Sequence, residues 1–194
     1  MNESVRKWDY FRDFPAYYGQ IVFPISIAKI TTDMNPENMF GFIRWAFEKV
    51  KVYYEISGVF LYTGSLYARY GLSAKQDNES LMNQHMNLSK RILDQDNSGI
   101  LMKDAYMFLD WDYALRSYRK LIEQSKNQLL QAYREDTEFQ QTVVYDIGHM
   151  LMKEVDEHTV HFLLEEIATT CLLTKKYIIL DHPFTSKKNT WTLI

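Results

Sequence analysis

The alternation of short apolar runs with longer helical patterns most constrains how this chain can fold. Apolar runs lie at residues 21–25, 52–61, 105–109 and 177–180, and most of the sequence between them has helical periodicity. Strands that alternate with helices are typical of α/β proteins, in which helices connect the strands of a parallel sheet. We therefore predict an α/β fold with a parallel sheet and helices on both of its faces.

The helical patterns predict helices at residues 35–50, 79–94, 113–133, 135–153 and 157–173. The first has the clearest start signal, because Asn35 can cap a helix and Pro36 suits its first turn. The segment before residue 79 contains Gly64 and Gly71, and we expect it to form a loop.

Composition favours one domain that spans residues 1–194, because 46% of the 194 residues are hydrophobic and no linker or repeat interrupts them. The N-terminal stretch lacks the apolar run of a signal peptide, and no segment has the ~18 apolar residues of a membrane span. We expect a soluble, cytoplasmic monomer without a membrane segment. The single cysteine, Cys171, is predicted to be a buried small hydrophobe rather than a reactive thiol.

The net charge of −3 disfavours a generally basic surface for nucleic acid. Local basic clusters remain, one at Lys90 and Arg91 and a second at Arg116, Arg119, Lys120 and Lys126. Spacings of three and four residues place several of these on one helix face. Each cluster is either a nucleic-acid contact or a solvated face balanced by neighbouring acids.

Ser26 directly follows the apolar run at residues 21–25 and precedes the first predicted helix. This order places it at the carboxyl edge of a parallel sheet, where such sheets bind their substrates. Ser26 is therefore a candidate reacting group. Serines in this position also commonly cap a helix or turn, and position alone does not separate the two interpretations.

Several familiar enzyme motifs are absent from the sequence, including nucleotide-binding glycine patterns, the nucleophile elbow and metal-spaced cysteines. The nearest approach to a metal site is the helical set Glu157, His158, His161 and Glu165. This set lacks the usual order of a zinc-binding helix, and histidines on an amphipathic helix are more often half-buried surface groups. We predict neither a metal nor an organic cofactor.

Five segments, read in order, resemble the cyclodipeptide synthases. They are residues 24–29 (PISIAK), 38–48 (NMFGFIRWAFE), 71–75 (GLSAK), 133–139 (YREDTEF) and 162–166 (FLLEE). The likeness covers residues 21–183, and its most distinctive parts are Ser26 and the D-T-E-F stretch between two predicted helices.

This resemblance implies a Rossmann-like fold similar to the catalytic domain of class I tyrosyl- and tryptophanyl-tRNA synthetases, but without an ATP site. It implies that two aminoacyl-tRNAs are the substrates and that no cofactor is needed. Enzymes of this family hold the first aminoacyl group as a serine ester, join the second to it and release a cyclic dipeptide. The resemblance assigns the nucleophile to Ser26. Pro24 stands where the family often has glycine, which implies a reshaped first aminoacyl pocket.

The family also has a tyrosine followed four residues later by a glutamate, a pair that holds the substrate amine and relays protons. The matching residues are Phe162 and Glu166, so the glutamate is kept and the hydroxyl is not. The resemblance then leaves the amine to His161 or Lys29. The register shifted by one residue, His161 with Glu165, is the alternative.

A third family element is a C-terminal strand that ends in a tyrosine, which a proline follows in one subgroup. Residues 177–183 resemble it, with His182 in place of the tyrosine and lining the site. The family's basic tRNA-binding helix is reduced to Lys90 and Arg91. The sequence thus predicts an aminoacyl-tRNA-dependent cyclodipeptide synthase, and the alternative is a catalytically silent Rossmann-like protein that binds tRNA or a partner.

Overall fold

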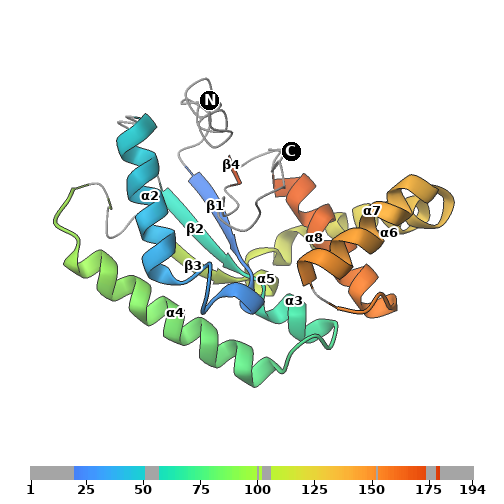
Figure 1. Ribbon diagram of the computed structural model, residues 1–194, viewed down its shortest axis with the longest axis horizontal. Helices are drawn as coiled ribbons and strands as arrows, with labels where there is room; N and C mark the ends of the chain where they lie inside the picture. Colours follow the sequence, from blue (N-terminus) through green and yellow to red (C-terminus); the bar gives the residue numbers. More distant parts are fainter. Residues whose placement is uncertain are drawn as a thin grey trace.

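The computed structural model describes residues 20–50, 57–99, 101, 106–151, 153–173 and 178–179. Within these residues one sheet has the strand order β3–β2–β1–β4, and every neighbouring pair is parallel (Figure 1). The strands are β1 (Gln20–Ile25), β2 (Ser57–Tyr62), β3 (Tyr106–Asp110) and β4 (Ile178–Ile179). The predicted parallel α/β sheet is confirmed.

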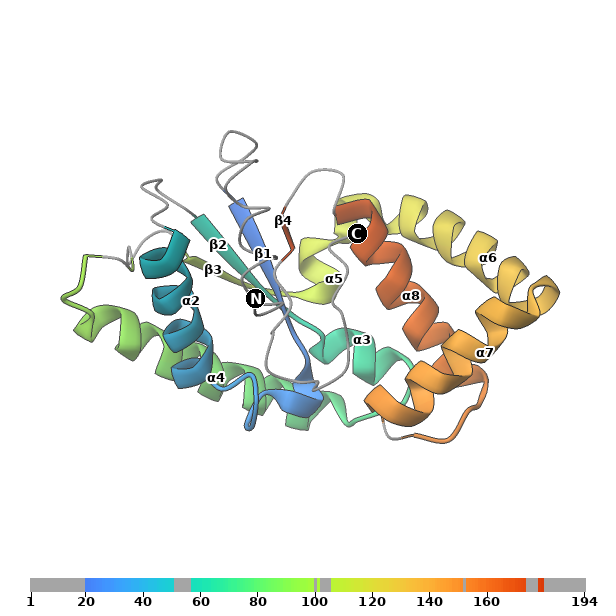
Figure 2. The same cartoon turned by 45° about the horizontal axis from the view of Figure 1, so that its top comes forward.

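Helices flank this sheet on both sides. They are α2 (Pro36–Val50), α3 (Gly64–Arg69), α4 (Lys75–Gln95), α5 (Trp111–Ala114), α6 (Arg119–Glu135), α7 (Thr137–Asp146) and α8 (Glu157–Leu173). Figures 1 and 2 show α2 and α4 together on one side of the strands, and α6, α7 and α8 gathered on the other. Within the part of the chain that the structure describes, no helix is long and apolar enough to cross a membrane.

The helix at 157–173 is confirmed as α8, and the predicted start of α2 is confirmed in detail. The side chain of Asn35 accepts a hydrogen bond from the backbone N–H of Asn38 at 2.9 Å, which satisfies one of the free donors at the start of the helix. Helix α4 begins at Lys75, one turn before its predicted start. The expected strand residues 52–56, 105, 177 and 180 lie outside the described residues.

The predicted loop around residues 64–71 is wrong, because its first six residues form helix α3. Tertiary contacts override the weak local signal here: Leu66 and Tyr67 are buried, and the side-chain amide of Asn78 donates to the backbone oxygen of Gly64 at 2.8 Å. Gly71, with φ of 67°, follows the helix in the left-handed region that favours glycine.

The two long predicted helices are also divided. The first becomes α5, then the 3-10 turn η3 (Arg116–Tyr118) and then α6. Buried Trp111 and Leu115 anchor that short first helix in the core. The second becomes α7 followed by the π-helical turn η4 (Ile147–Leu151), and the side chain of Asp136 caps the start of α7.

A row of aromatic rings crosses the sheet beneath α2. Phe23, Phe60 and Phe108 are register partners on β1, β2 and β3, and each neighbouring pair stacks with ring centroids 5.2 Å apart. Phe40 of α2 packs edge-on against Phe60 at 5.5 Å. Offset and edge-on pairs add to the stabilisation that comes from burial alone. This face anchors α2 and sets the register of the three strands.

Two residues further along β2, the hydroxyl of Tyr62 lies 2.8 Å from Nδ1 of buried His85 on α4. The other ring nitrogen, Nε2, lies 2.9 Å from the backbone oxygen of Met34, so Nε2 carries the proton and Nδ1 accepts from Tyr62. Burial lowers the pKa of His85, which keeps the ring neutral. The ring therefore ties the loop that carries Met34 to α4 and to the carboxyl end of β2.

Candidate active site

Ser26 lies directly after the last residue of β1, in an extended conformation at the start of the 3-10 turn η1 (Ile27–Lys29). Its side chain makes no capping hydrogen bond to that turn. Instead its Oγ lies 3.1 Å from the hydroxyl oxygen of Tyr67. The capping interpretation of Ser26 is therefore wrong, and the hydroxyl lies half-buried at the carboxyl edge of the sheet.

Thr63 holds the backbone on both sides of Ser26. The N–H and the hydroxyl of Thr63 both donate to the backbone oxygen of Ile25, at 3.0 and 3.2 Å, and its hydroxyl oxygen accepts from the N–H of Ile27 at 3.0 Å. Thr63 is completely buried, so water does not compete for these bonds. The strand register brings this about, because Ile25 and Tyr62 are partners and each is the last residue of its strand.

Tyr67 lies one helical turn after Thr63, and its N–H donates to the backbone oxygen of Thr63 at 2.9 Å. This spacing carries the tyrosine ring to the same edge as Ser26. The residue is only 6% exposed. Burial and the negative charge of Glu166 raise the pKa of Tyr67 to about 12, although the hydrogen bond with Ser26 opposes the shift. The side chain is thus a neutral phenol at physiological pH, able both to donate and to accept a hydrogen bond.

Phe162 of α8 packs against Tyr67, and Glu166 of the same helix acts on Tyr67 through its charge. The Phe162 ring is completely buried and packs edge-on against the Tyr67 ring, with centroids 4.6 Å apart. Glu166 is half-buried, and its charge acts on the Tyr67 hydroxyl. Tyr67 therefore links the candidate residues: it is hydrogen-bonded to Ser26, packs against Phe162 and is affected by the charge of Glu166.

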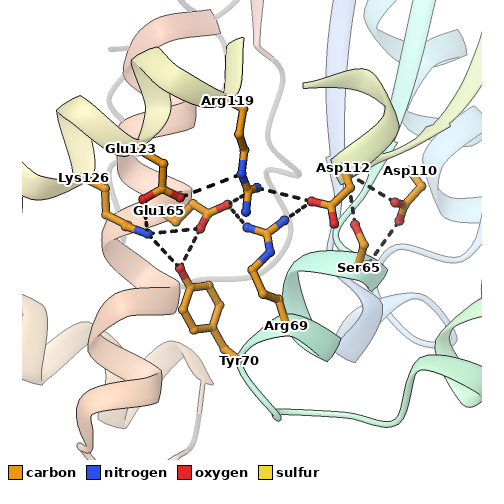
Figure 3. Close-up of polar contacts among 9 residues, drawn as sticks. All are labelled: Ser65, Arg69, Tyr70, Asp110, Asp112, Arg119, Glu123, Lys126 and Glu165. Carbon is orange, nitrogen blue, oxygen red and sulfur yellow. Dashed lines mark hydrogen bonds and ion pairs between the residues drawn. The ribbon is translucent and has the colours of Figure 1, made fainter. Parts of the chain in front are cut away.

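Glu165, the adjacent residue of α8, is completely buried in a different environment (Figure 3). It forms an ion pair with Arg69, accepts a hydrogen bond from the hydroxyl of Tyr70 at 2.6 Å, and pairs with Arg119 at 3.3 Å and with Lys126 at 3.7 Å. These partners come from α3, the residue after it, and α6. Glu165 thus joins three segments that are distant in the sequence.

The network extends to α5 through a second acidic residue. Arg69 also pairs with Asp112, which lies 3.5 Å from Arg119. Burial opposes ionisation of Glu165, but the hydrogen bond from Tyr70 and the guanidinium of Arg69 outweigh it, so the pKa of Glu165 lies below its usual value. Glu165 is therefore a carboxylate that anchors α8, whereas the charge of Glu166 acts on Tyr67.

Two further residues predicted to bind substrate, Pro24 and Lys29, lie on either side of Ser26 in the chain. Pro24 is half-buried in β1 and pairs with Leu61, and Lys29 is half-buried at the end of η1. His161 is 25% exposed at the side chain, and its Nε2 lies 3.9 Å from Glu157. His182 lies outside the described residues.

Lys90 and Arg91 are both exposed on α4, on the part of the surface expected to meet tRNA. In the second basic cluster, Arg119 and Lys126 belong to the Glu165 network, whereas Arg116 and Lys120 are exposed. Cys171 is half-buried on α8 rather than fully buried. In the described ranges, no group of three or more His, Cys, Asp or Glu side chains is placed to hold a metal ion.

Sequence reasoning missed Thr63 and Tyr67, which contact Ser26 and the backbone beside it, and it missed Arg69 and Tyr70, which anchor Glu165. All four lie in or next to α3, which was predicted as a loop. Their one usable signal is the spacing of four residues between Thr63 and Tyr67 directly after an apolar run, which suits a strand that leads into a helix.

The fold and this edge define a Rossmann-like α/β protein with a serine at the end of its first described strand. The fold is similar to the solved structure described as that of a CDPS, a cyclodipeptide synthase, from Fluoribacter dumoffii. The TM-score is 0.55 with 18% sequence identity, and the match covers 89% of this chain and 78% of that one. No family model matches the chain, and no relative is found among curated proteins. The fold expected from the resemblance is confirmed.

We expect Glu165→Gln to lower the free energy of unfolding by about 3 kcal/mol at neutral pH, because it removes a completely buried carboxylate from its three cationic partners. The pKa of Glu165 is depressed in the folded state, so its contribution is present above the unfolded pKa and is lost as pH falls through the folded value. The difference between the two proteins should therefore shrink in acid. Urea unfolding at a series of pH values measures this difference.

Glu123→Gln is the matched control. Glu123 contacts Lys126 at 2.7 Å and Arg119 at 3.8 Å, but its side chain is 39% exposed. Its loss should cost less than about 1 kcal/mol. Equal costs for the two variants would contradict the anchoring role of Glu165.

Proposed function

We propose that this protein is an aminoacyl-tRNA-dependent cyclodipeptide synthase that works by ping-pong acyl transfer through an ester on Ser26. The observation that carries the proposal is the position of the Ser26 hydroxyl. It lies 3.1 Å from the hydroxyl of Tyr67 at the carboxyl edge of a sheet, in a chain whose fold is similar to that of a CDPS. Tyr67 in turn packs against Phe162 and is affected by the charge of Glu166. The sequence resemblance supplies the substrates and the product.

In the first step, Ser26 Oγ attacks the ester carbonyl of an aminoacyl-tRNA, and the aminoacyl group moves to the serine. One ester is exchanged for another, so the serine needs positioning and a path for its proton rather than strong activation. The hydrogen bonds of Thr63 to Ile25 and Ile27 supply the positioning, because they fix the turn that carries Ser26.

The negative charge that develops on the carbonyl oxygen needs a backbone donor near Ser26. The N–H of Ser26 donates to the thioether sulfur of Met34 at 3.2 Å, whereas that of Ile27 donates to the hydroxyl of Thr63. A thioether is a weak acceptor, so an oxyanion would displace it readily. We assign the oxyanion donor to the Ser26 N–H.

In the second step, the amine of the next aminoacyl-tRNA attacks the seryl ester, and an amide bond forms as the bond from the carbonyl carbon to Ser26 Oγ breaks. Glu166 accepts the proton of the amine, and Ser26 regains its hydroxyl proton. The free amine of the resulting dipeptidyl-tRNA then attacks its own ester, which closes the ring and releases tRNA with a free hydroxyl. Lys29 and His161 are the groups proposed to hold the amine, and His182 is proposed to line the site. Pro24 shapes the pocket for the first aminoacyl side chain. The exposed Lys90 and Arg91 of α4 provide contacts for tRNA phosphates.

The test of this function is covalent loading. The protein is incubated with tRNA charged with a mixture of radiolabelled amino acids, and label is measured on the acid-precipitated protein. We expect label on the wild-type protein and none on Ser26→Ala. Cyclic dipeptides should appear in the medium of cells that overexpress the wild-type protein and not in that of cells that overexpress Ser26→Ala.

Ser65→Ala is the control for this test. Ser65 is a serine at the same edge, but its hydroxyl accepts from the N–H of Asp112 at 3.0 Å, so this variant should still load. Label that survives in Ser26→Ala would point to another nucleophile. A wild-type protein that never loads but still binds tRNA would favour the silent binding protein.

A second prediction separates the two neighbouring glutamates. Glu166→Gln should lose cyclic product but keep labelled enzyme, because a group that takes the amine proton acts after the first ester forms. Glu165→Gln should make product at the wild-type rate per folded protein, so that its total rate falls only as the folded fraction falls. For each variant, mass spectrometry measures the cyclic product, and the radiolabel bound per folded protein measures loading. Loss of product from folded Glu165→Gln, with Glu166→Gln unaffected, would favour the shifted register.

A third prediction concerns α4. Reversing the charges of Lys90 and Arg91 together should raise the apparent KM for aminoacyl-tRNA and leave loading from a small activated amino-acid ester unchanged, because only tRNA carries phosphates. Lys75→Glu, about 22 Å away along the same helix, is the control. If both substrates suffer equally, the helix is structural, and exposed Arg116 and Lys120 become the surface to test.

A further inference from the structure

The resemblance predicts a tyrosine hydroxyl four residues before the catalytic glutamate, and the chain has Phe162 at that position. Phe162 is completely buried against the ring of Tyr67. Tyr67 in turn brings a hydroxyl to within 3.1 Å of Ser26 Oγ. The site therefore has a phenol at the serine, although it comes from α3 and not from α8.

Two other hydroxyl groups near this edge have different partners. The hydroxyl of Tyr70, whose ring also packs edge-on against Phe162, donates to Glu165 at 2.6 Å and accepts from Lys126 at 3.3 Å. The hydroxyl of Thr63 is bonded to the backbone on both sides of Ser26. Of these three hydroxyl groups, that of Tyr67 is the one hydrogen-bonded to Ser26, the proposed nucleophile.

We propose that Tyr67 is a further catalytic residue of the proposed reaction, whose hydroxyl replaces the one that Phe162 lacks. This inference rests on the proposed function. As a C–O bond forms between Ser26 Oγ and the aminoacyl carbonyl carbon, the bond from that carbon to the ribose oxygen of tRNA breaks. The proton of Ser26 passes to the hydroxyl oxygen of Tyr67, and the proton of Tyr67 passes to the ribose oxygen. Tyr67 ends as a neutral phenol, and tRNA leaves with a free hydroxyl.

The surroundings of Tyr67 suit this exchange. A relay must hold a proton before the step and hold one again after it, which requires a neutral phenol. Burial and the charge of Glu166 maintain that state by raising the pKa of Tyr67. The edge-on contact with Phe162 and the helical hydrogen bond to Thr63 hold the ring in place. The Tyr67 side chain therefore loses little conformational entropy when its hydroxyl takes part in the reaction.

The experiment measures single-turnover loading of Ser26 from tRNA charged with radiolabelled amino acids. Tyr67→Phe keeps the ring and removes the hydroxyl, and we expect loading about 10²-fold slower, the effect of losing a positioned proton-transfer group. The affinity for charged tRNA should not change. Tyr70→Phe is the matched control: it removes a hydroxyl near the same Phe162 ring and should load at the wild-type rate per folded protein.

A rescue variant separates proton transfer from packing. Phe162→Tyr, introduced into the Tyr67→Phe protein, restores a hydroxyl to the position predicted by the resemblance and should recover loading. A double variant no faster than Tyr67→Phe would contradict the equivalence of the two hydroxyls. Wild-type loading by Tyr67→Phe would overturn the inference and leave the proposed function intact. Absence of label on the wild-type protein would instead overturn the proposed function.

Discussion

The hydrogen bonds of Thr63 to the backbone on both sides of Ser26 are the constraint on which the rest of the site depends. They join the end of β2 to the end of β1, where the strand ladder stops and the backbone would otherwise be free to turn. Because Thr63 also accepts the first helical bond from Tyr67, the same residue sets both the serine and the phenol that meets it. Buried Thr63 thus fixes the backbone on both sides of Ser26 and also provides the first hydrogen-bond acceptor of α3.

The two neighbouring glutamates of α8 show how one helix can serve two environments. Successive residues of a helix point about 100° apart, so adjacent carboxylates face different neighbours. Glu165 is surrounded by Arg69, Arg119 and Lys126, whereas the charge of Glu166 acts on Tyr67. The first carboxylate holds the helix against α3 and α6, and the second is the one assigned to the reaction proposed here.

Strong local patterns made part of this structure predictable. The apolar run before Ser26, the Asn35 cap of α2 and the pattern of α8 all appear where the sequence placed them. Helix α3 could not be found in this way, because its position depends on contacts with Asn78 and Asp110, which lie far along the chain.

The same limit applies to the site. Spacing identified Glu165 and Glu166 as alternatives but could not separate them, because the cationic partners of Glu165 come from α3 and α6. It also could not find Tyr67, since nothing local links that residue to Ser26, 41 positions earlier. The resemblance named a missing hydroxyl, and only the packing of the rings indicates where another hydroxyl lies.

Ionic strength should act very differently on the two groups of charges in this molecule. Dissolved ions screen exposed charges such as those of Lys90 and Arg91, but they screen a completely buried carboxylate much less. Salt therefore weakens the electrostatic interactions of Glu165 between α3 and α8 much less than those of the exposed charges on α4. A salt wash that removes nucleic acid carried through purification would leave the alignment of Tyr67 with Phe162 intact.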